Sequence, residues 1–199
     1  GCRLSRHVIT TFGDRLQTDA TKIDHALLGR IFPIGSHRDD QGVLTIGDVP
    51  VTRLIEEHDS PLYVFDEQTI RAQCRAYTTP LSSNYPNSLA LYAAKAHVDP
   101  TIASIVASEG LGMDAVSSGE IRVGLAGGMP PGRMVLHGNN KLEREIEYAL
   151  AVGIGRIVAD SLDELDLIED IAKRRGQIAP VILRITPGVE AHTHDYIRT

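Results

Sequence analysis

The stretch from Met134 to Ala159, MVLHGNNKLEREIEYALAVGIGRIVA, contains one complete strand–helix–strand unit. Its first residues, Met134–His137, are mostly apolar and typical of a short buried strand, and its last residues, Arg156–Ala159, predict the next strand. Between them, Asn140 followed by Glu143 predicts a capping box at the start of a helix, and Gly153 predicts its end. This alternation is typical of a parallel sheet with right-handed crossovers.

The same unit recurs on both sides of this stretch. Asp99 before Pro100 and Ser161 before Glu164 predict two further helix starts. The predicted strands are Leu89–Ala96, Gly112–Ser117, Met134–His137, Arg156–Ala159 and Pro180–Thr186. Their starts are almost equally spaced, which favours a (β/α)8 TIM-type barrel over an open doubly wound sheet. Such a barrel needs about 250 residues, so we expect an α/β fold that holds a partial barrel, truncated at the C-terminus.

The residues before this alternation of strands and helices predict a different organisation. Residues 1–30 show no clean period and are expected to form an irregular extension. Residues 31–65 form a second part, and residues 66–199 contain the partial barrel. The elements expected between residues 43 and 79 are a strand at Val43–Ile46, a turn at Gly47-Asp48, a helix at Val51–His58, a strand at Leu62–Phe65, and a helix that is capped by Asp66 and runs to about Thr79.

Composition excludes several classes of function. The formal net charge is −6, with 20 basic and 26 acidic residues, and no cluster of Lys and Arg predicts nucleic-acid binding. No apolar run is long enough to span a membrane. Cys2 and Cys74 cannot form a disulfide framework or a four-cysteine zinc site. We expect a cytoplasmic protein, or a plastid one if residues 1–30 prove to be a transit segment.

In a (β/α)8 barrel the functional groups lie at the carboxyl ends of the strands. Lys95 stands near the end of an apolar predicted strand, where a lysine is costly unless it is paired or used covalently. Burial favours the neutral amine, which suits covalent chemistry with a carbonyl group. The alternative is a lysine at a strand end whose ammonium group reaches solvent.

Four segments carry a resemblance to a known family. The segments YAAKAH at Tyr92–His97, GLGMDAVSSGE at Gly110–Glu120 and HGNNK at His137–Lys141 resemble the fold-type-III pyridoxal-phosphate decarboxylases. That group includes the diaminopimelate, ornithine and arginine decarboxylases. The segment LRITPGVEAHTHDYIRT at Leu183–Thr199 is similar to the diaminopimelate branch.

The resemblance implies an alanine-racemase-like barrel to which residues 31–65 and a C-terminal β-domain are attached. It also implies pyridoxal 5′-phosphate as cofactor, and decarboxylation of meso-2,6-diaminopimelate to L-lysine, the last step of lysine biosynthesis. The full-length protein is expected to be a homodimer that binds a small amino-acid substrate, with neither a nucleic acid nor a membrane as partner. The part of the enzyme present in this chain is expected to be inactive alone.

Residue by residue, the resemblance assigns Lys95 as the catalytic lysine that holds the cofactor covalently. It assigns Asp114 and Arg184 to cofactor binding. The remaining candidate pocket residues are Tyr92, Ala94, Glu120, His137, Asn139, His192 and His194. Glu120 has an alternative role, because an acidic side chain after Gly119 also complements the start of a helix.

Two questions stay open in the sequence. His192 and His194 could face the same side of an extended segment, but no further ligand has suitable spacing, so no metal is expected. The activity has alternatives as well: a carboxynorspermidine, arginine or ornithine decarboxylase, or a barrel protein that binds pyridoxal phosphate without decarboxylase activity. The phosphate loop, the partner of the ring nitrogen and the residues of substrate specificity are expected after residue 199.

Overall fold

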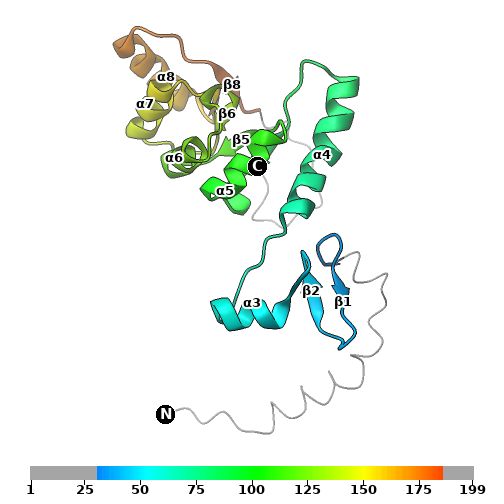
Figure 1. Ribbon diagram of the computed structural model, residues 1–199. Coiled ribbons are helices and arrows are strands. Elements are labelled where there is room, and N and C mark those ends of the chain that lie inside the picture. The colour runs from blue at the N-terminus through cyan, green and yellow to red at the C-terminus, as the bar shows by residue number, and fades with distance from the viewer. Residues whose placement is uncertain (1–30, 186–199) are drawn as a thin grey trace, which may run out of the picture. The chain divides into compact units, whose positions relative to one another are not determined.

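A computed structural model describes residues 31–185 of the chain (Figure 1). The chain divides into two compact units, Gly1–Ile70 and Arg71–Thr199, each of which is described by itself. In the described residues, no helix is long and apolar enough to cross a membrane.

The first unit contains a small antiparallel sheet and one helix. Its elements are β1 (His37–Arg38), β2 (Leu44–Ile46), β3 (Val49–Pro50) and α3 (Val51–His58), with the strand order β1-β2-β3. The predicted turn at Gly47-Asp48 is confirmed, since it joins β2 to β3 with positive φ at both residues, 56° and 64°. That conformation is the one that a two-residue hairpin needs.

The strand predicted at Leu62–Phe65 is wrong. The segment is irregular, and no described strand pairs with it. Its aromatic side chains are exposed, Tyr63 by 91% and Phe65 by 53%. Apolar β-forming residues alone do not make a strand, because β-propensity depends on a neighbouring strand and on burial.

The second unit is a five-stranded parallel sheet with helices in the crossovers. Its strands are β4 (Leu91–Ala93), β5 (Gly112–Ala115), β6 (Met134–Leu136), β7 (Arg156–Ala159) and β8 (Val181–Leu183). They lie side by side in the order of the sequence, and every neighbouring pair is parallel. This confirms the α/β class and the strand order expected for a partial (β/α)8 barrel. The helices are α4 (Glu67–Asn84), α5 (Pro100–Ser108), α6 (Ser118–Ala126), α7 (Glu143–Val152) and α8 (Leu162–Arg175), with 3₁₀ turns at Ala94–Ala96 and Pro131–Arg133. The boundary between the two units lies within α4.

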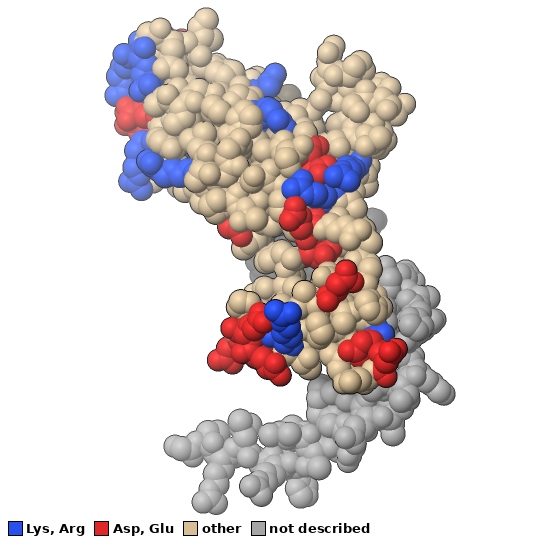
Figure 2. Space-filling model, in the orientation of Figure 1, with Lys and Arg blue, Asp and Glu red and all other residues tan. Residues whose placement is uncertain are grey.

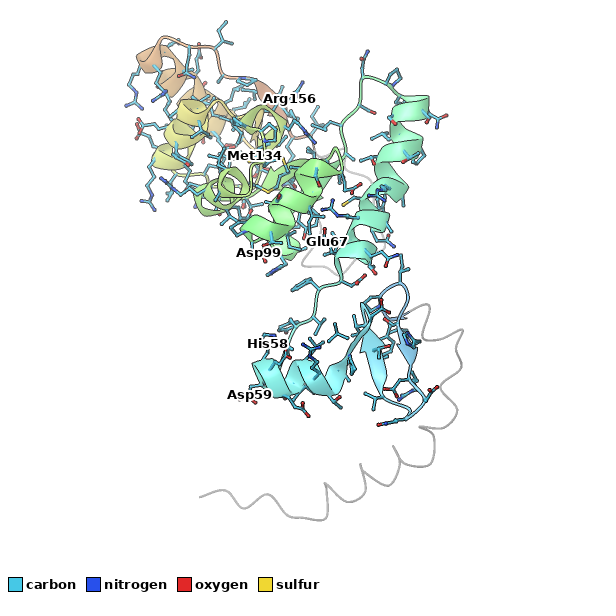
Figure 3. The ribbon with its side chains drawn as sticks, in the orientation of Figure 1. His58, Asp59, Glu67, Asp99, Met134 and Arg156 are labelled. Atoms are coloured by element: carbon cyan, nitrogen blue, oxygen red, sulfur yellow. The ribbon has the colours of Figure 1, made fainter. Side chains whose placement is uncertain are left out.

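The core of the second unit lies between one face of the sheet and the helices α5 to α8, which follow one another along that face (Figure 1). Alternate strand residues build the sheet side of this core, because successive side chains of a strand point to opposite faces. Met113, Met134, Leu136 and Ile157 are all fully buried there, and Met134 is labelled in Figure 3. The opposite face carries Asp114 together with the apolar residues Ala93 and Val135, which pair with it.

Three predicted helix starts have different outcomes. Asp99 (Figure 3) caps α5, since its Oδ1 accepts a hydrogen bond from the amide of Ile102 at 2.8 Å. Ser161 caps α8 in the same way, with its Oγ 3.1 Å from the amide of Glu164. The predicted start of α7 at Asn140 is wrong. Asn140 has a φ of 52° and belongs to a turn, so the helix begins at Glu143.

Basic and acidic side chains both lie on the part of the second unit formed by α7 and α8 (Figure 2). The guanidinium of Arg174 on α8 is hydrogen-bonded to Glu143 on α7 and lies 3.7 Å from Glu147. These side chains are about half exposed, and exposed ion pairs of this kind contribute little to stability. The pattern is that of a solvated surface.

Helix α4 is attached to α5 by a cluster of three charged groups. Arg71 Nη1 donates to the Glu109 carboxylate at 2.9 Å, and Arg75 Nε and Nη2 donate to it at 2.7 and 2.8 Å. The Glu109 side chain is 9% exposed. Hydrogen bonds from Arg75 and then Arg71 lower the pKa of Glu109 to about 2.

The helix that carries these arginines ends at Asn84, past Pro80, so the predicted end at Thr79 is wrong.

We expect Gly155→Ala to destabilise the protein. A Cβ at Gly155 would lie 2.2 Å from the backbone oxygen of Gly132, and the backbone must move to admit it. The expected loss in the free energy of unfolding is about 1–3 kcal/mol, measured by urea denaturation. Gly132→Ala is the control, because a Cβ there meets nothing within 4 Å. Equal midpoints for the two variants would contradict this account of the close approach.

The Glu109 cluster predicts a pH dependence. The folded pKa of about 2 lies below the usual 4.5, so the unfolded chain binds more protons between these values. The contribution of Glu109 to stability is therefore complete above about pH 4.5 and disappears as the pH falls towards 2. Urea denaturation across this window should show a smaller loss for Glu109→Gln than for the wild type. The exposed Glu56→Gln variant is the control, and a wild-type profile in Glu109→Gln would refute the prediction.

Candidate functional site

The carboxyl ends of the parallel strands meet at one edge of the sheet, on the face that the helices do not cover. In the register, Ala93 pairs with Asp114, and Asp114 pairs with Val135. These residues alternate with the buried row of Met113 and Met134, so they belong to the opposite face. The register therefore places residues of three successive strands, β4 to β6, on one face at this edge.

Lys95 lies in the 3₁₀ turn Ala94–Ala96, just after β4. Of the two environments considered for Lys95, the structure shows the one that reaches solvent: β4 ends at Ala93, and Lys95 is exposed whereas Ala94 is 2% exposed. The hydroxyl of Tyr92 donates to the carbonyl of His97 at 2.6 Å, which closes the loop around Lys95. Tyr92 and Ala94 thus shape the segment that presents the amine.

Asp114 and His137 form a pair at the ends of β5 and β6. His137 Nδ1 lies 3.2 Å from Asp114 Oδ2, and the side chains are 39% and 22% exposed. The other carboxylate oxygen, Oδ1 of Asp114, is buried and has no hydrogen-bond partner among the described residues. A buried acceptor without a donor is unfavourable by about 1–3 kcal/mol. A ligand that brings a donor to this oxygen would remove that penalty.

Arg184 and Asp160 form a second pair at the ends of β8 and β7. Arg184 Nη1 donates to Asp160 Oδ1 at 2.9 Å, and the backbone amide of Arg184 donates to Ala159 at 3.0 Å. This backbone hydrogen bond continues the β7–β8 pairing beyond Leu183 and places Arg184 at the carboxyl edge of the sheet, as Asp114 is. Asp160 leaves part of the donor fork of Arg184 available, since the arginine side chain is 38% exposed.

The other predicted pocket residues have varied surroundings. Glu120 Oε2 accepts from the amide of Val116 at 2.7 Å, while Ser117 Oγ accepts from the amide of Glu120 at 3.2 Å. Ser117 thus caps α6, and Oε2 of Glu120 is engaged by the backbone just before the helix. Asn139 is exposed in the loop after β6. His192 and His194 lie outside the described residues, within which no group of three or more metal-ligating side chains occurs.

The described lysines have three different environments. Lys173 on α8 is exposed and forms an ion pair with Glu169 at 2.8 Å. Lys141 has a side chain only 2% exposed, bound to Glu164 at 2.9 Å. Lys95 forms no hydrogen bond or ion pair with another described residue. Among these three, Lys95 offers the accessible amine. The Lys141–Glu164 pair was missed in the sequence, because nothing there indicates that the two residues meet.

The chain matches a family model described as "Pyridoxal-dependent decarboxylase, pyridoxal binding domain" over residues 67–199. It is 42% identical over 170 residues to the diaminopimelate decarboxylase of Bacillus subtilis, covering 85% of this chain and 39% of the relative. It is 39% identical over 173 residues to that of Mycobacterium tuberculosis, covering 87% of this chain and 38% of the relative. The chain thus spans well under half of the length of these curated relatives.

A solved structure of a diaminopimelate decarboxylase has a similar fold. The diaminopimelate decarboxylase of M. jannaschii, crystallised with L-lysine, superposes with a TM-score of 0.73 and 30% sequence identity. The similarity covers 82% of this chain and 38% of that chain.

Proposed function

The chain belongs to the pyridoxal-dependent decarboxylases, whose pyridoxal-binding domain it contains, and we propose that its protein converts meso-2,6-diaminopimelate to L-lysine. The observation that carries the proposal is the 39% and 42% identity to two diaminopimelate decarboxylases over most of the chain. The L-lysine in the M. jannaschii structure is the product of such a reaction. The cofactor is pyridoxal 5′-phosphate.

The described residues fit this cofactor. An accessible amine at Lys95 suits an aldehyde. The unpartnered Oδ1 of Asp114 suits a hydrogen-bond donor, and the partly free guanidinium of Arg184 suits an oxygen acceptor. We assign Lys95 to the covalent attachment of the cofactor, and Asp114 and Arg184 to non-covalent contacts with the cofactor or the substrate. Pyridoxal phosphate, when bound, supplies an electron sink for the charge left by loss of carbon dioxide.

The chain's own residues prepare the site in three ways. Asp114 pairs with Ala93, which directly precedes the turn that carries Lys95, and its Oδ1 would offer an acceptor to a group bound there. His137 holds the Asp114 carboxylate in place through the 3.2 Å contact with its Oδ2, so that Oδ1 remains free. Asp160 orients the Arg184 guanidinium from the other side, at 2.9 Å. A guanidinium held in this manner binds carboxylates or phosphates with its remaining donors.

Substrate choice depends on the far end of the substrate. Diaminopimelate carries an ammonium and a carboxylate there, whereas ornithine and arginine carry only a cation. A site built to bind the distal carboxylate rejects substrates that lack it, because its polar groups would remain unpaired. A homodimer and a cytoplasmic location belong to the same proposal, as does the attachment of residues 31–65 to a second domain.

We expect the cofactor to be attached to Lys95 in the full-length protein. After incubation with pyridoxal phosphate, reduction with borohydride and proteolysis, mass spectrometry should find the pyridoxyl group on the peptide that contains Lys95. Lys95→Ala should abolish the absorbance of the bound cofactor. Lys173→Ala is the matched control, since this exposed lysine should not matter. A label on Lys141 or Lys173 in place of Lys95 would refute the assignment.

We expect the full-length protein to release carbon dioxide from meso-diaminopimelate in strong preference to ornithine and arginine. A site that hydrogen-bonds a polar group of its substrate rejects analogues without that group by about 10⁴-fold or more. Carbon dioxide release from the three compounds at equal concentration measures the ratio. Comparable or faster turnover of ornithine or arginine would favour the alternative decarboxylases and leave the cofactor assignment intact.

A further inference from the structure

The most deeply buried ion pair among the described residues lies beside the candidate site. Lys141 follows β6 in the loop that contains His137, and Glu164 lies in the first turn of α8, after Asp160. Their side chains are 2% and 8% exposed, and Lys141 Nζ is 2.9 Å from Glu164 Oε2.

The ammonium group of Lys141 joins three pieces of backbone or side chain. Besides Glu164, Nζ donates to the carbonyl of Gly138 at 2.5 Å and to the carbonyl of Val158 at 2.6 Å. An ammonium group has three N–H donors, and all three are used here. Lys141 is therefore unavailable as a nucleophile, and it connects the loop after β6 to strand β7.

The Glu164 carboxylate completes the connection. Its Oε2 accepts from the amide of Asp160 at 2.8 Å, and its Oε1 accepts from the amide of Lys141 at 3.3 Å. Gly138 directly follows His137, which binds Asp114, and Asp160 binds Arg184. The ion pair thus fixes the backbone next to both polar pairs of the site.

Stability alone does not account for this ion pair. A buried ion pair seldom stabilises a protein more than apolar residues of the same volume, because both charges lose their hydration. Its particular effect is geometric: one charged group with fixed hydrogen bonds holds two loops in one arrangement. That effect matters where side chains must be positioned for chemistry, since a displacement of about 1 Å can lower a rate on the order of 100-fold.

We propose that Lys141 and Glu164 are positioning residues that set the places of His137 and Asp160, and through them of Asp114 and Arg184. The proposal deepens the function proposed above and rests on it. Both side chains are buried and bound to each other and to backbone groups, so they act through the backbone next to these residues.

The test is a double variant of the full-length protein, Lys141→Met with Glu164→Gln, which removes both charges and leaves no buried ion unpaired. The matched control carries the same two substitutions at the exposed pair, Lys173→Met with Glu169→Gln. We expect amide hydrogens of residues 138–141 and 159–161 to exchange roughly tenfold faster in the site variant only. Its dissociation constant for pyridoxal phosphate, from a spectral titration, should rise about tenfold.

The kinetic constants separate positioning from simple loss of folded protein. In the site variant, kcat should fall on the order of 100-fold with a smaller change in KM, while the control keeps both constants. A folded site variant with wild-type exchange and wild-type cofactor affinity overturns the proposal, and so do equal effects in the control. Failure of the wild type to release carbon dioxide from diaminopimelate overturns only the proposed function, because exchange and cofactor affinity do not depend on turnover.

A measurement on the wild type decides the matter if the site variant does not fold. The amides of Lys141 and Asp160, which donate to Glu164, should exchange as slowly as amides of the neighbouring strands. Rapid exchange at both would show that the ion pair does not hold these loops and would overturn the proposal.

Discussion

The two-residue alternation along the parallel strands is the constraint on which the core and the candidate site both depend. One row of the sheet, with Met113 and Met134 in neighbouring strands, is fully buried against the helices. The register that aligns these methionines also places Ala93, Asp114 and Val135 side by side on the opposite face. A slip of one residue in β5 would exchange its two faces and move Asp114 into the core. Apolar burial on the helix-covered face of the sheet therefore determines which residues lie on the opposite face.

The amino and carboxyl ends of the strands differ in backbone packing and in charged side chains. At the amino ends the backbones of neighbouring units approach so closely that glycine is required. A Cβ at Gly112 would lie 2.2 Å from the carbonyl of Arg133, and Gly155 is similarly confined. At the carboxyl ends the loops instead present paired charges, Asp114 with His137 and Asp160 with Arg184. Close packing at one end fixes the strands, and this allows the other end to hold Asp114 Oδ1, a polar atom without a hydrogen-bond partner in residues 31–185.

The environments of Lys95 and Lys141 show how burial separates two roles of one residue type. A buried lysine near a strand end is costly unless it is paired or reactive, and this holds for Lys141 rather than for Lys95. Lys141 is the buried lysine, and three acceptors surround its ammonium group. Lys95 is exposed in a 3₁₀ turn, where its amine remains accessible. An amine that is to bind an aldehyde needs this accessibility, whereas one that fixes backbone needs the opposite.

The sequence by itself determined the alternation of strands and helices, the parallel sheet and its strand order, because apolar runs, caps such as Asp99 and Ser161, and glycines are local signals. Its motifs also determined the family, whose model matches residues 67–199. Only the tertiary structure decided what depends on distant partners. Leu62–Phe65 pairs with no described strand and is irregular, and α7 begins at Glu143 because Asn140 lies in a turn. The contacts of His137 with Asp114, and of Lys141 with Glu164, join residues from different βα units. Such contacts are set by register and packing, which no local pattern of residues specifies.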